Sequence, residues 1–305
     1  MRASIITPTY KNDLEIVREL CASVDAFVSD DIHHYLVVSR DQYKLFAEFD
    51  SPRRTVKVIE DLLPRGFFKL PLPAKLPFTG KTLREWWVAP GKLRVSGWVM
   101  QQIVKMSGPA ICDSEILLFI DSDVTLLRRM TTDLFVEGKA IRFVHKPGQG
   151  ADQAAQQSWS AVIGPLLDVG RMDYYGADYV GNIISWRRDT LLRLHARIAK
   201  GTGLPWQVAV ARNPVFSEYI TYGVFIDHVE KDETDHARTA ESLTLNSWNY
   251  TLSKPGEESR FLDDLKPHHV GVLLQSIEKI PTTTRERIIA GLKSRIAMQD
   301  QTQSA

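Results

Sequence analysis

Two aspartates separated by one serine follow an apolar run, and they are the strongest candidates for chemistry in this sequence. The run is Ile116 to Ile120, and Asp121-Ser122-Asp123 comes directly after it. A continuous apolar run of this length is typical of a strand buried on both faces of a sheet. In open parallel sheets, ligands bind beyond the carboxyl ends of the strands. Two carboxylates placed there could share a hard divalent cation, Mn²⁺ or Mg²⁺, and the phosphates that it carries.

A second group of polar side chains follows the first predicted strand, residues 3–7. This group consists of Thr7, Pro8, Thr9, Tyr10 and Asp13. Its hydroxyls, aromatic ring and carboxylate could hold a nucleotide base and a ribose. The predicted helix before the Asp-Ser-Asp segment carries Gln102 and Lys105, and Lys105 could pair with a phosphate as a point charge. An ordinary half-buried helix explains the same pattern equally well.

The order of the predicted elements indicates the frame that positions these residues. Strands are predicted at 3–7, 35–39, 55–59, 115–120, 141–144 and 179–186, and helices at 14–24, 98–106, 188–199 and 284–299. This alternation of strands and helices predicts an α/β fold with a parallel sheet flanked by helices. Residues 61–94 are predicted to be a long irregular excursion, and residues 147–160 a flexible loop.

Composition excludes several classes of protein. Lys+Arg is 38 and Asp+Glu is 37, which argues against a general nucleic-acid binder. The balance conceals residues 61–94, which hold seven basic and two acidic residues. The two cysteines, Cys21 and Cys112, are too few for a disulfide scaffold or a cysteine zinc site. Without a signal-like N-terminus or a bilayer-length apolar run, the expected location is the cytoplasm.

Together, these features resemble the GT-A glycosyltransferases. The resemblance rests on residues 5–10 as the first nucleotide-binding strand and turn, on 117–123 as the Asp-x-Asp strand, and on 181–188 as the strand and helix start that follow. Within that superfamily, the sequence looks like a poorly characterised bacterial group. The resemblance implies a GT-A-like α/β fold with a mixed, mostly parallel sheet flanked by helices. It implies one domain over 1–280, with a Rossmann-like nucleotide-binding half (1–125) and an acceptor-binding half (126–280), before a C-terminal helical extension and tail (281–305).

The resemblance also implies metal-dependent transfer of a sugar from a nucleotide-sugar donor to a glycan or lipid-linked acceptor. Asp123 would bind the cation, Asp121 would contact the cation or the ribose, and Ser122 would lie against the nucleotide. Glu218 would act as the general base, which predicts inversion at the anomeric carbon. The segment holding Glu218 departs from the family's Glu-Asp pair, and Asp178 is the rival base. Glu218 could instead be a carboxylate at a helix start or an acceptor contact.

Other roles are carried over from the same resemblance. His268 would complete the metal shell, with His228 as the alternative. The predicted acceptor contacts are Asn182, Trp186, Tyr219 and Tyr222. Trp86, Trp87 and Trp159 are further candidates for stacking on sugar rings, although core packing is the commoner fate of a tryptophan.

Two other functions remain open. A sugar-phosphate nucleotidyltransferase also uses a nucleotide-binding sheet and a metal, but residues 7–13 lack the glycine-rich loop of that class. A catalytically silent module that binds nucleotide or glycan on the same fold is the second. The basic C-terminal helix could also lie on an anionic membrane, which would make the protein peripheral to the inner face, although packing on its own domain is more common.

Overall fold

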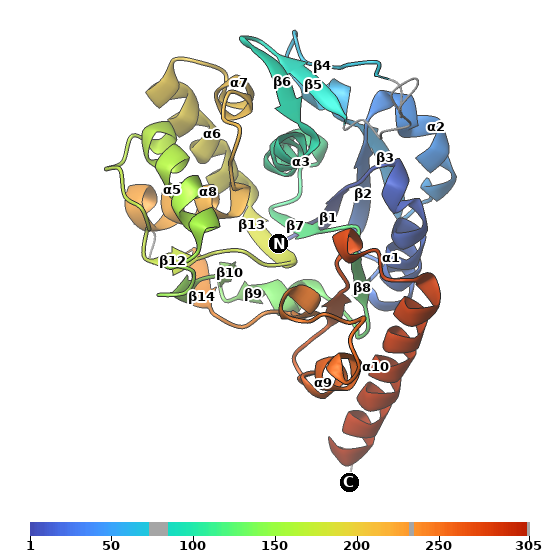
Figure 1. Cartoon of the computed structure of the whole chain (residues 1–305). Coiled ribbons are helices and arrows are strands. Elements are labelled where there is room, and N and C mark those ends of the chain that lie inside the picture. The colour runs from blue at the N-terminus through green and yellow to red at the C-terminus, as the bar shows by residue number, and fades with distance from the viewer. Residues whose placement is uncertain (73–84, 232–234, 304–305) are drawn as a thin grey trace.

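A five-stranded sheet lies at the centre of the computed structural model (Figure 1). Its strand order is β13-β7-β1-β2-β3, with β1 at Ala3–Pro8, β2 at His33–Val38, β3 at Arg54–Val58, β7 at Ile116–Ile120 and β13 at Ile183–Arg187. Only β13 runs antiparallel to its neighbour, so the sheet is mixed and mostly parallel. The structure describes residues 1–72, 85–231 and 235–303. The predicted α/β class is therefore confirmed.

The side chains of β7 explain why this strand is buried on both faces. Leu117 and Phe119 join one apolar cluster, whereas Ile116, Leu118 and Ile120 join another. Because successive side chains of a strand point to opposite faces, the two clusters lie on opposite sides of the sheet. All five side chains are fully buried. The continuous apolar run is thus the sequence signature of a strand between two covering layers.

Helices supply both covering layers. Among the described residues they are α1 (Leu14–Phe27), α2 (Tyr43–Phe46), α3 (Gly97–Met106), α4 (Gly108–Ile111), α5 (Ala154–Leu167), α6 (Arg188–Thr202), α7 (Trp206–Ala211), α8 (Glu218–Val224), α9 (Glu257–Asp263) and α10 (Thr282–Gln303). Helices α3 and α6 pack into the cluster that contains Phe119, and α1 packs into the opposite one. Parallel strands need such crossover helices, which leave helices on the faces of the sheet.

Smaller sheets surround the central one. They comprise β4 (Phe68–Lys69), β5 (Trp86–Ala89) and β6 (Lys92–Ser96); β8 (Val124–Leu126), β15 (Thr244–Asn246) and β16 (Gly271–Leu273); β9 (Val136–Glu137), β10 (Ala140–Val144) and β14 (His236–Thr239); and β11 (Lys146–Pro147) with β12 (Ala177–Asp178). The β4-β5-β6 sheet lies at the top of Figure 1, far from α9 and α10 at the bottom.

Some predictions about secondary structure are wrong. The predicted loop at 147–160 contains the start of α5, because alanine and glutamine there favour helix. The predicted irregular segment 61–94 contains β4, β5 and β6, and Gly91, with φ of +75°, permits the tight turn between the last two strands. Residues 73–84 lie outside the described residues. The predicted strand at 179–186 begins only at Ile183.

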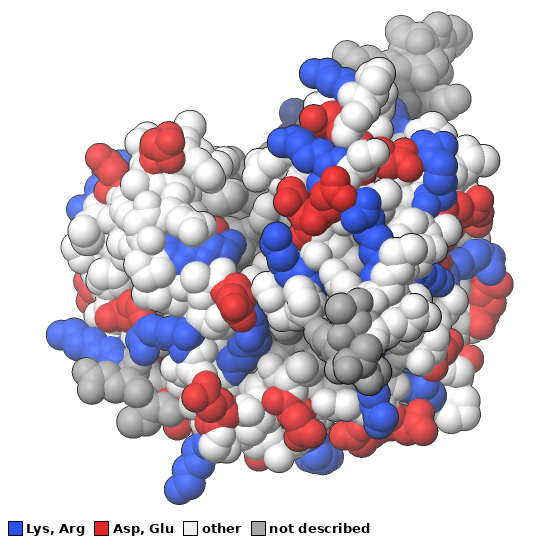
Figure 2. All heavy atoms as spheres, turned by 90° about the horizontal axis from the view of Figure 1, so that it is seen from below, with Lys and Arg blue, Asp and Glu red and all other residues white. Residues whose placement is uncertain are grey.

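The predicted C-terminal helix is confirmed as α10, and its apolar face is buried. Ile288 and Leu292 are fully buried in a cluster with Phe261 and Val272. These side chains pack on the rest of the protein, so the apolar face of α10 is not available to a membrane surface. None of the described helices combines the length and the apolar character needed to cross a bilayer. Acidic and basic side chains are mixed over the face in Figure 2, as the overall charge balance predicts.

Candidate active site

The Asp-Ser-Asp segment connects β7 to β8 at the carboxyl edge of the central sheet. Asp121 and Asp123 are partly exposed, and Ser122 is buried. The Ser122 hydroxyl donates a hydrogen bond of 2.9 Å to Oδ2 of Asp13, which follows β1. Because β1 and β7 are parallel neighbours, the polar residues that follow them meet at one edge, as the sequence predicts.

Asn182 lies beside Asp121. Ile183 pairs with Ile120 in the antiparallel β13–β7 ladder, which places the preceding Asn182 next to the residue after Ile120. The Asn182 side-chain amide donates a hydrogen bond of 2.5 Å to Oδ1 of Asn246, at the end of β15. Sequence reasoning missed Asn246, because a three-residue strand gives almost no periodic signal. The site thus collects polar groups from β7, β13 and β15.

Asp123 is held by groups from the C-terminal part of the chain. Its Oδ2 accepts a hydrogen bond of 3.0 Å from the Ser276 N–H, just after β16. The buried guanidinium of Arg285, on α10, donates to the carbonyl oxygens of Asp123 at 3.3 Å and Leu274 at 2.9 Å. It also donates to Glu19 Oε2 at 2.7 Å. Arg285 and Glu19, which the sequence did not single out, therefore brace the segment that carries Asp123.

The buried Lys105 ammonium contacts two carboxylates, those of Asp121 and Glu218. Its Nζ lies 2.8 Å from Asp121 Oδ1 and 3.2 Å from Glu218 Oε1, and it donates a 2.7 Å hydrogen bond to the Tyr219 hydroxyl. The two carboxylate distances add to 6.0 Å, so the two oxygens lie no farther apart than that. The Lys105 side chain is only 4% exposed. Lys105 therefore meets carboxylates of the protein, where the sequence predicted a phosphate.

Local capping sets the positions of these side chains. The hydroxyl of Ser96 caps α3, and that of Ser217 caps α8, so each helix begins at a defined residue. Gln102 precedes Lys105 by about one turn on α3, which puts both on the same face. Gln102 Oε1 accepts a 3.0 Å hydrogen bond from the N–H of Glu218, the first residue of α8. The start of α8 is thereby fixed against α3.

Burial shifts the protonation of the site toward its neutral carboxyl forms. Burial, and then the charge of Asp121, raises the pKa of Asp123 to about 6. Burial also raises the pKa of Asp13 and of Glu218, and Asp121 adds to both shifts. Burial alone would lower the pKa of Lys105, but the neighbouring Asp121, Tyr219 and Glu218 raise it well above its usual range. The site therefore carries more carboxylates than its one buried ammonium can balance.

The raised pKa of Asp123 predicts how stability changes with pH. Its folded-state pKa of about 6 exceeds the ordinary 3.8, so the folded protein holds this proton more tightly than the unfolded chain. The contribution of protonated Asp123 to the free energy of unfolding is fully present below the ordinary pKa of 3.8, and it is lost as pH rises through about 6. The loss is at most about 3 kcal/mol. Urea unfolding should show Asp123→Asn to be more stable than wild type at pH 7.5, with the gain shrinking toward pH 4; a gain independent of pH would contradict this assignment.

The residues at this edge fit a divalent cation held in part by a ligand. Among the described residues, no group of three or more His, Cys, Asp or Glu side chains is able to hold a metal. The protein would thus supply Asp121 and Asp123, and phosphate oxygens and water would complete the shell, as is usual for Mg²⁺ beside nucleotides. Thr9 Oγ1 and Gln102 Nε2 are buried without a hydrogen-bond partner, so polar groups remain for a ligand.

Thr7 does not face the edge. Its hydroxyl donates to the Ile120 carbonyl at 2.7 Å and lies 3.0 Å from Nε2 of His34, whose Nδ1 accepts from Arg54. These buried hydrogen bonds connect β1, β2, β3 and β7. They leave the Thr7 hydroxyl unavailable to a nucleotide, which corrects the role predicted for Thr7. Pro8 ends β1 and is buried. Tyr10 is 41% exposed and remains available.

Two predicted acceptor contacts are core residues. Trp186 is 1% exposed and Tyr222 is fully buried, and their rings stack with centroids 4.5 Å apart. The Tyr222 hydroxyl accepts from the Arg187 N–H at 3.0 Å and lies 2.9 Å from Nε2 of His236. The prediction that these aromatic residues bind the acceptor is therefore wrong. The hydroxyl of Tyr219, in contrast, lies in the Lys105 cluster.

The rival base and the predicted metal-binding histidines lie elsewhere. The Asp178 carboxylate accepts hydrogen bonds from Lys146 at 3.2 Å and from Gln156 at 2.7 Å. Strands β8 and β16 are antiparallel, and Val124 pairs with Leu273. Asp123 comes just before β8 and therefore lies beside the C-terminal end of β16, whereas His268 comes before the N-terminal end of β16. The structure thus separates His268 from Asp123, which corrects its place in the metal shell. His228 contacts the Tyr175 carbonyl at 3.1 Å instead.

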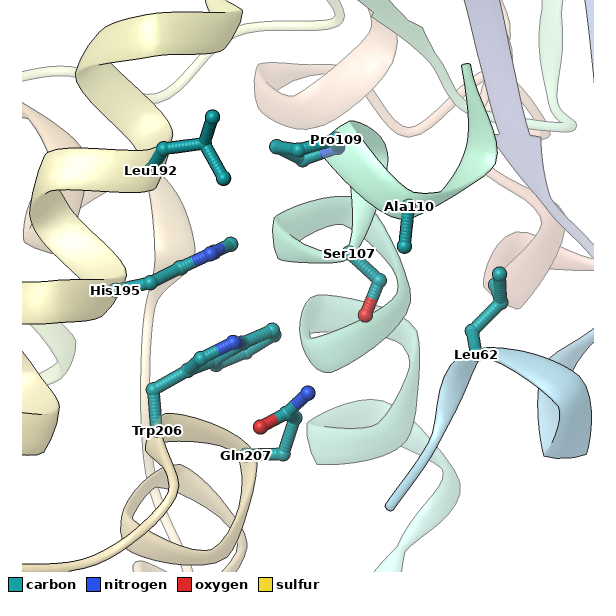
Figure 3. Close-up of a pocket in the computed structure, with 8 residues that line it drawn as sticks. All are labelled: Leu62, Ser107, Pro109, Ala110, Leu192, His195, Trp206 and Gln207. Atoms are coloured by element: carbon teal, nitrogen blue, oxygen red, sulfur yellow. The ribbon is translucent and has the colours of Figure 1, made fainter. Parts of the chain in front are cut away.

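Two cavities of the described residues are lined by residues other than those of this edge. One, of about 170 Å³, lies between α3, α4, α6 and α7 (Figure 3) and is lined by Leu62, Ser107, Pro109, Ala110, Leu192, His195, Trp206 and Gln207. His195 stacks on Trp206 there, and burial lowers the pKa of His195 to about 4. Another, of about 390 Å³, is lined by Leu134, Val136, Glu137, Arg142, Ala237, Arg238 and Thr239. Neither of these two cavities is lined by Asp121 or Asp123.

Comparison with known proteins gives a family for the chain. No curated protein matches the sequence. A family model does match residues 3–290, a range that extends from β1 to the part of α10 that holds Arg285. The chain therefore belongs to the family described as "Family of unknown function (DUF6492)".

Proposed function

We propose that this protein is a metal-dependent glycosyltransferase of GT-A type, which transfers a sugar from a nucleotide-sugar to a glycan or lipid-linked acceptor. The observation that carries the proposal is the pair of partly exposed carboxylates, Asp121 and Asp123, at the carboxyl edge of a mostly parallel sheet. Ligands of open α/β sheets bind at this edge. The neighbouring Asp13 and the exposed Tyr10 offer a carboxylate and a ring to the nucleoside.

The proposed cation ligands are Asp121 and Asp123. Mn²⁺ or Mg²⁺ bound there would neutralise the nucleoside diphosphate as it leaves. Asp123 is oriented by the Ser276 N–H, and Asp121 by the Lys105 ammonium. Lys105 also limits the negative charge of the pair, so that two adjacent carboxylates are tolerated at this edge. The protein's part is thus to hold two oxygen ligands in fixed directions.

Glu218 is the proposed general base. The Lys105 ammonium contacts both Glu218 and Asp121, so the contacting oxygens of the two carboxylates lie at most 6.0 Å apart. Its pKa is raised by burial, and a base whose pKa lies nearer neutral pH transfers protons more efficiently. It would accept the proton of the attacking acceptor hydroxyl, which predicts inversion at the anomeric carbon. Asp178, held by Lys146 and Gln156, is the less suitable carboxylate.

A thermal-shift screen of nucleotide-sugars with and without Mn²⁺ tests the proposal. A donor that binds the folded state should stabilise it by about 2.7 kcal/mol at a hundredfold excess over Kd. We expect the shift to require Mn²⁺ and to disappear in Asp123→Asn, with Asp263→Asn on α9 as the exposed control. A silent binding module would show the shift without metal-dependent hydrolysis of the donor. A shift that survives Asp123→Asn would place the nucleotide elsewhere.

A further inference from the structure

The small β4-β5-β6 sheet lies at the end of the molecule opposite α9 and α10 (Figure 1). It exposes large apolar side chains. One face of this sheet is buried through Trp87 and Val95, each 2% exposed. Phe68 of β4 is 50% exposed, and Leu93 of β6 is 81% exposed. With 81% of its surface exposed, Leu93 packs on little of its own protein.

Four cations gather around these side chains. Gly66 lies against the Pro90 ring and Gly91 against the guanidinium of Arg212, because a Cβ on either glycine would come within 3.0 Å and 2.7 Å of those groups. These approaches bring together the turn before β4, the β5–β6 turn and the end of α7. We name the resulting surface the basic tip, which consists of Arg65, Phe68, Lys92, Leu93, Arg94 and Arg212.

The charges of the basic tip are not balanced by neighbouring acids. Among the described residues, Arg65, Lys92, Arg94 and Arg212 form no ion pair, and Arg94 lies 5.2 Å above the Trp86 ring. The acids of the same stretch are engaged elsewhere. Glu85 pairs with Lys69 at 2.9 Å, and Asp61 pairs with Arg40. An occupant of this surface should therefore be anionic and should offer an apolar layer.

We propose that the basic tip docks the protein on the surface of an anionic lipid bilayer. Phe68 and Leu93 would enter the boundary between headgroups and acyl chains, and the four cations would lie among the headgroup phosphates. Long basic side chains suit this arrangement, because their stems lie along apolar surface while the charge stays at the headgroups. The C-terminal helix α10 does not contribute, because Ile288 and Leu292 are buried.

The basic tip is connected to the candidate active site through one helix. Strand β6 ends at Ser96, which caps α3, and α3 carries Gln102 and Lys105 into the site. The inference does not rest on the proposed function, since vesicle binding is measured without donor, acceptor or metal.

Flotation of the full chain with vesicles tests the docking. We expect binding to vesicles of phosphatidylglycerol and phosphatidylcholine in equal parts, and little binding to phosphatidylcholine alone. Raising the salt from about 0.1 M to about 1 M should release the protein, because the screening length falls from about 10 Å to about 3 Å. Absence of binding to the anionic vesicles would overturn the proposal, and so would equal binding to both compositions.

Matched variants locate the contact. Leu93→Glu should weaken binding about tenfold, since it removes one buried apolar side chain from the boundary. Ile277→Glu is the control, because Ile277 is also 81% exposed but lies next to α10. Arg94→Gln should weaken binding about fivefold, with Lys293→Gln on α10 as its control. If the controls weaken binding as much as the tip variants do, the assignment to this surface is wrong.

Discussion

Replacement of Lys105 with methionine is expected to lower the free energy of unfolding by about 3–5 kcal/mol. The ammonium is the counter-charge of Asp121 at 2.8 Å and of Glu218 at 3.2 Å. Methionine fills a similar volume but leaves both carboxylates unpaired, and the Glu218 side chain is only 5% exposed. Breaking a buried pair costs far more than breaking an exposed one, because the remaining charge stays away from water. Urea unfolding at neutral pH measures the difference.

An exposed pair provides the control for this variant. Arg287 and Glu258 lie 2.6 Å apart, with side chains 61% and 25% exposed, so Arg287→Met should cost less than about 1 kcal/mol. The loss in Lys105→Met should also shrink as pH falls, because burial raises the pKa of Glu218 and protonation then removes the stranded charge of that carboxylate. A loss as small as that of the control would mean that solvent, rather than Lys105, compensates the two carboxylates.

Glu218→Gln is expected to lower kcat by about 10² to 10⁴, the range for loss of a positioned general base. Glutamine has nearly the same shape, and the bond from the Glu218 N–H to Gln102 uses the backbone, so α8 should keep its position. Binding of the donor with Mn²⁺ should remain close to wild type, since Asp121 and Asp123 are unchanged. Turnover and donor affinity, measured on the same preparations, separate these two effects.

Asp178→Asn is the matched carboxylate-to-amide control. Asp178 accepts hydrogen bonds from Lys146 and Gln156, so its change should alter stability more than turnover. If Asp178→Asn abolishes turnover while Glu218→Gln does not, the base assignment is reversed. The anomeric configuration of the product gives an independent reading, because a product that retains the donor's configuration would remove the need for either base.

The sequence predicted those parts of the site that follow from a single strand. Residues 116–120 are apolar on both faces, so a central strand and the position of Asp121 and Asp123 at its end could be inferred together. The contact of Ser122 with Asp13 also follows from local reasoning, since neighbouring parallel strands end at the same edge. Here the side-chain pattern and the topology agree, and little depends on distant packing.

Contacts between elements far apart in the chain could not be predicted in the same way. Tyr219 contacts Lys105 across 114 residues, and that pairing depends on how α8 meets α3. Trp186 belongs to the same short polar and aromatic segment as Asn182, but strand alternation points it into the core against Tyr222. For His268, the sequence shows a strand after it but not that the strand is antiparallel to β8, which sends the histidine to the opposite end from Asp123.

The brace supplied by Arg285 has a consequence for the time at which the site is completed. Arg285 bonds to the Asp123 carbonyl across 162 residues of chain. At the usual rate of synthesis, about 5–20 residues per second, those residues take roughly 8–32 s to make. During synthesis, β1 and β7 can pair long before α10 exists, so the Asp-Ser-Asp segment stays without its C-terminal brace for that interval. The nascent protein thus fixes Asp123 last, although this residue follows a strand made in the first half of the chain.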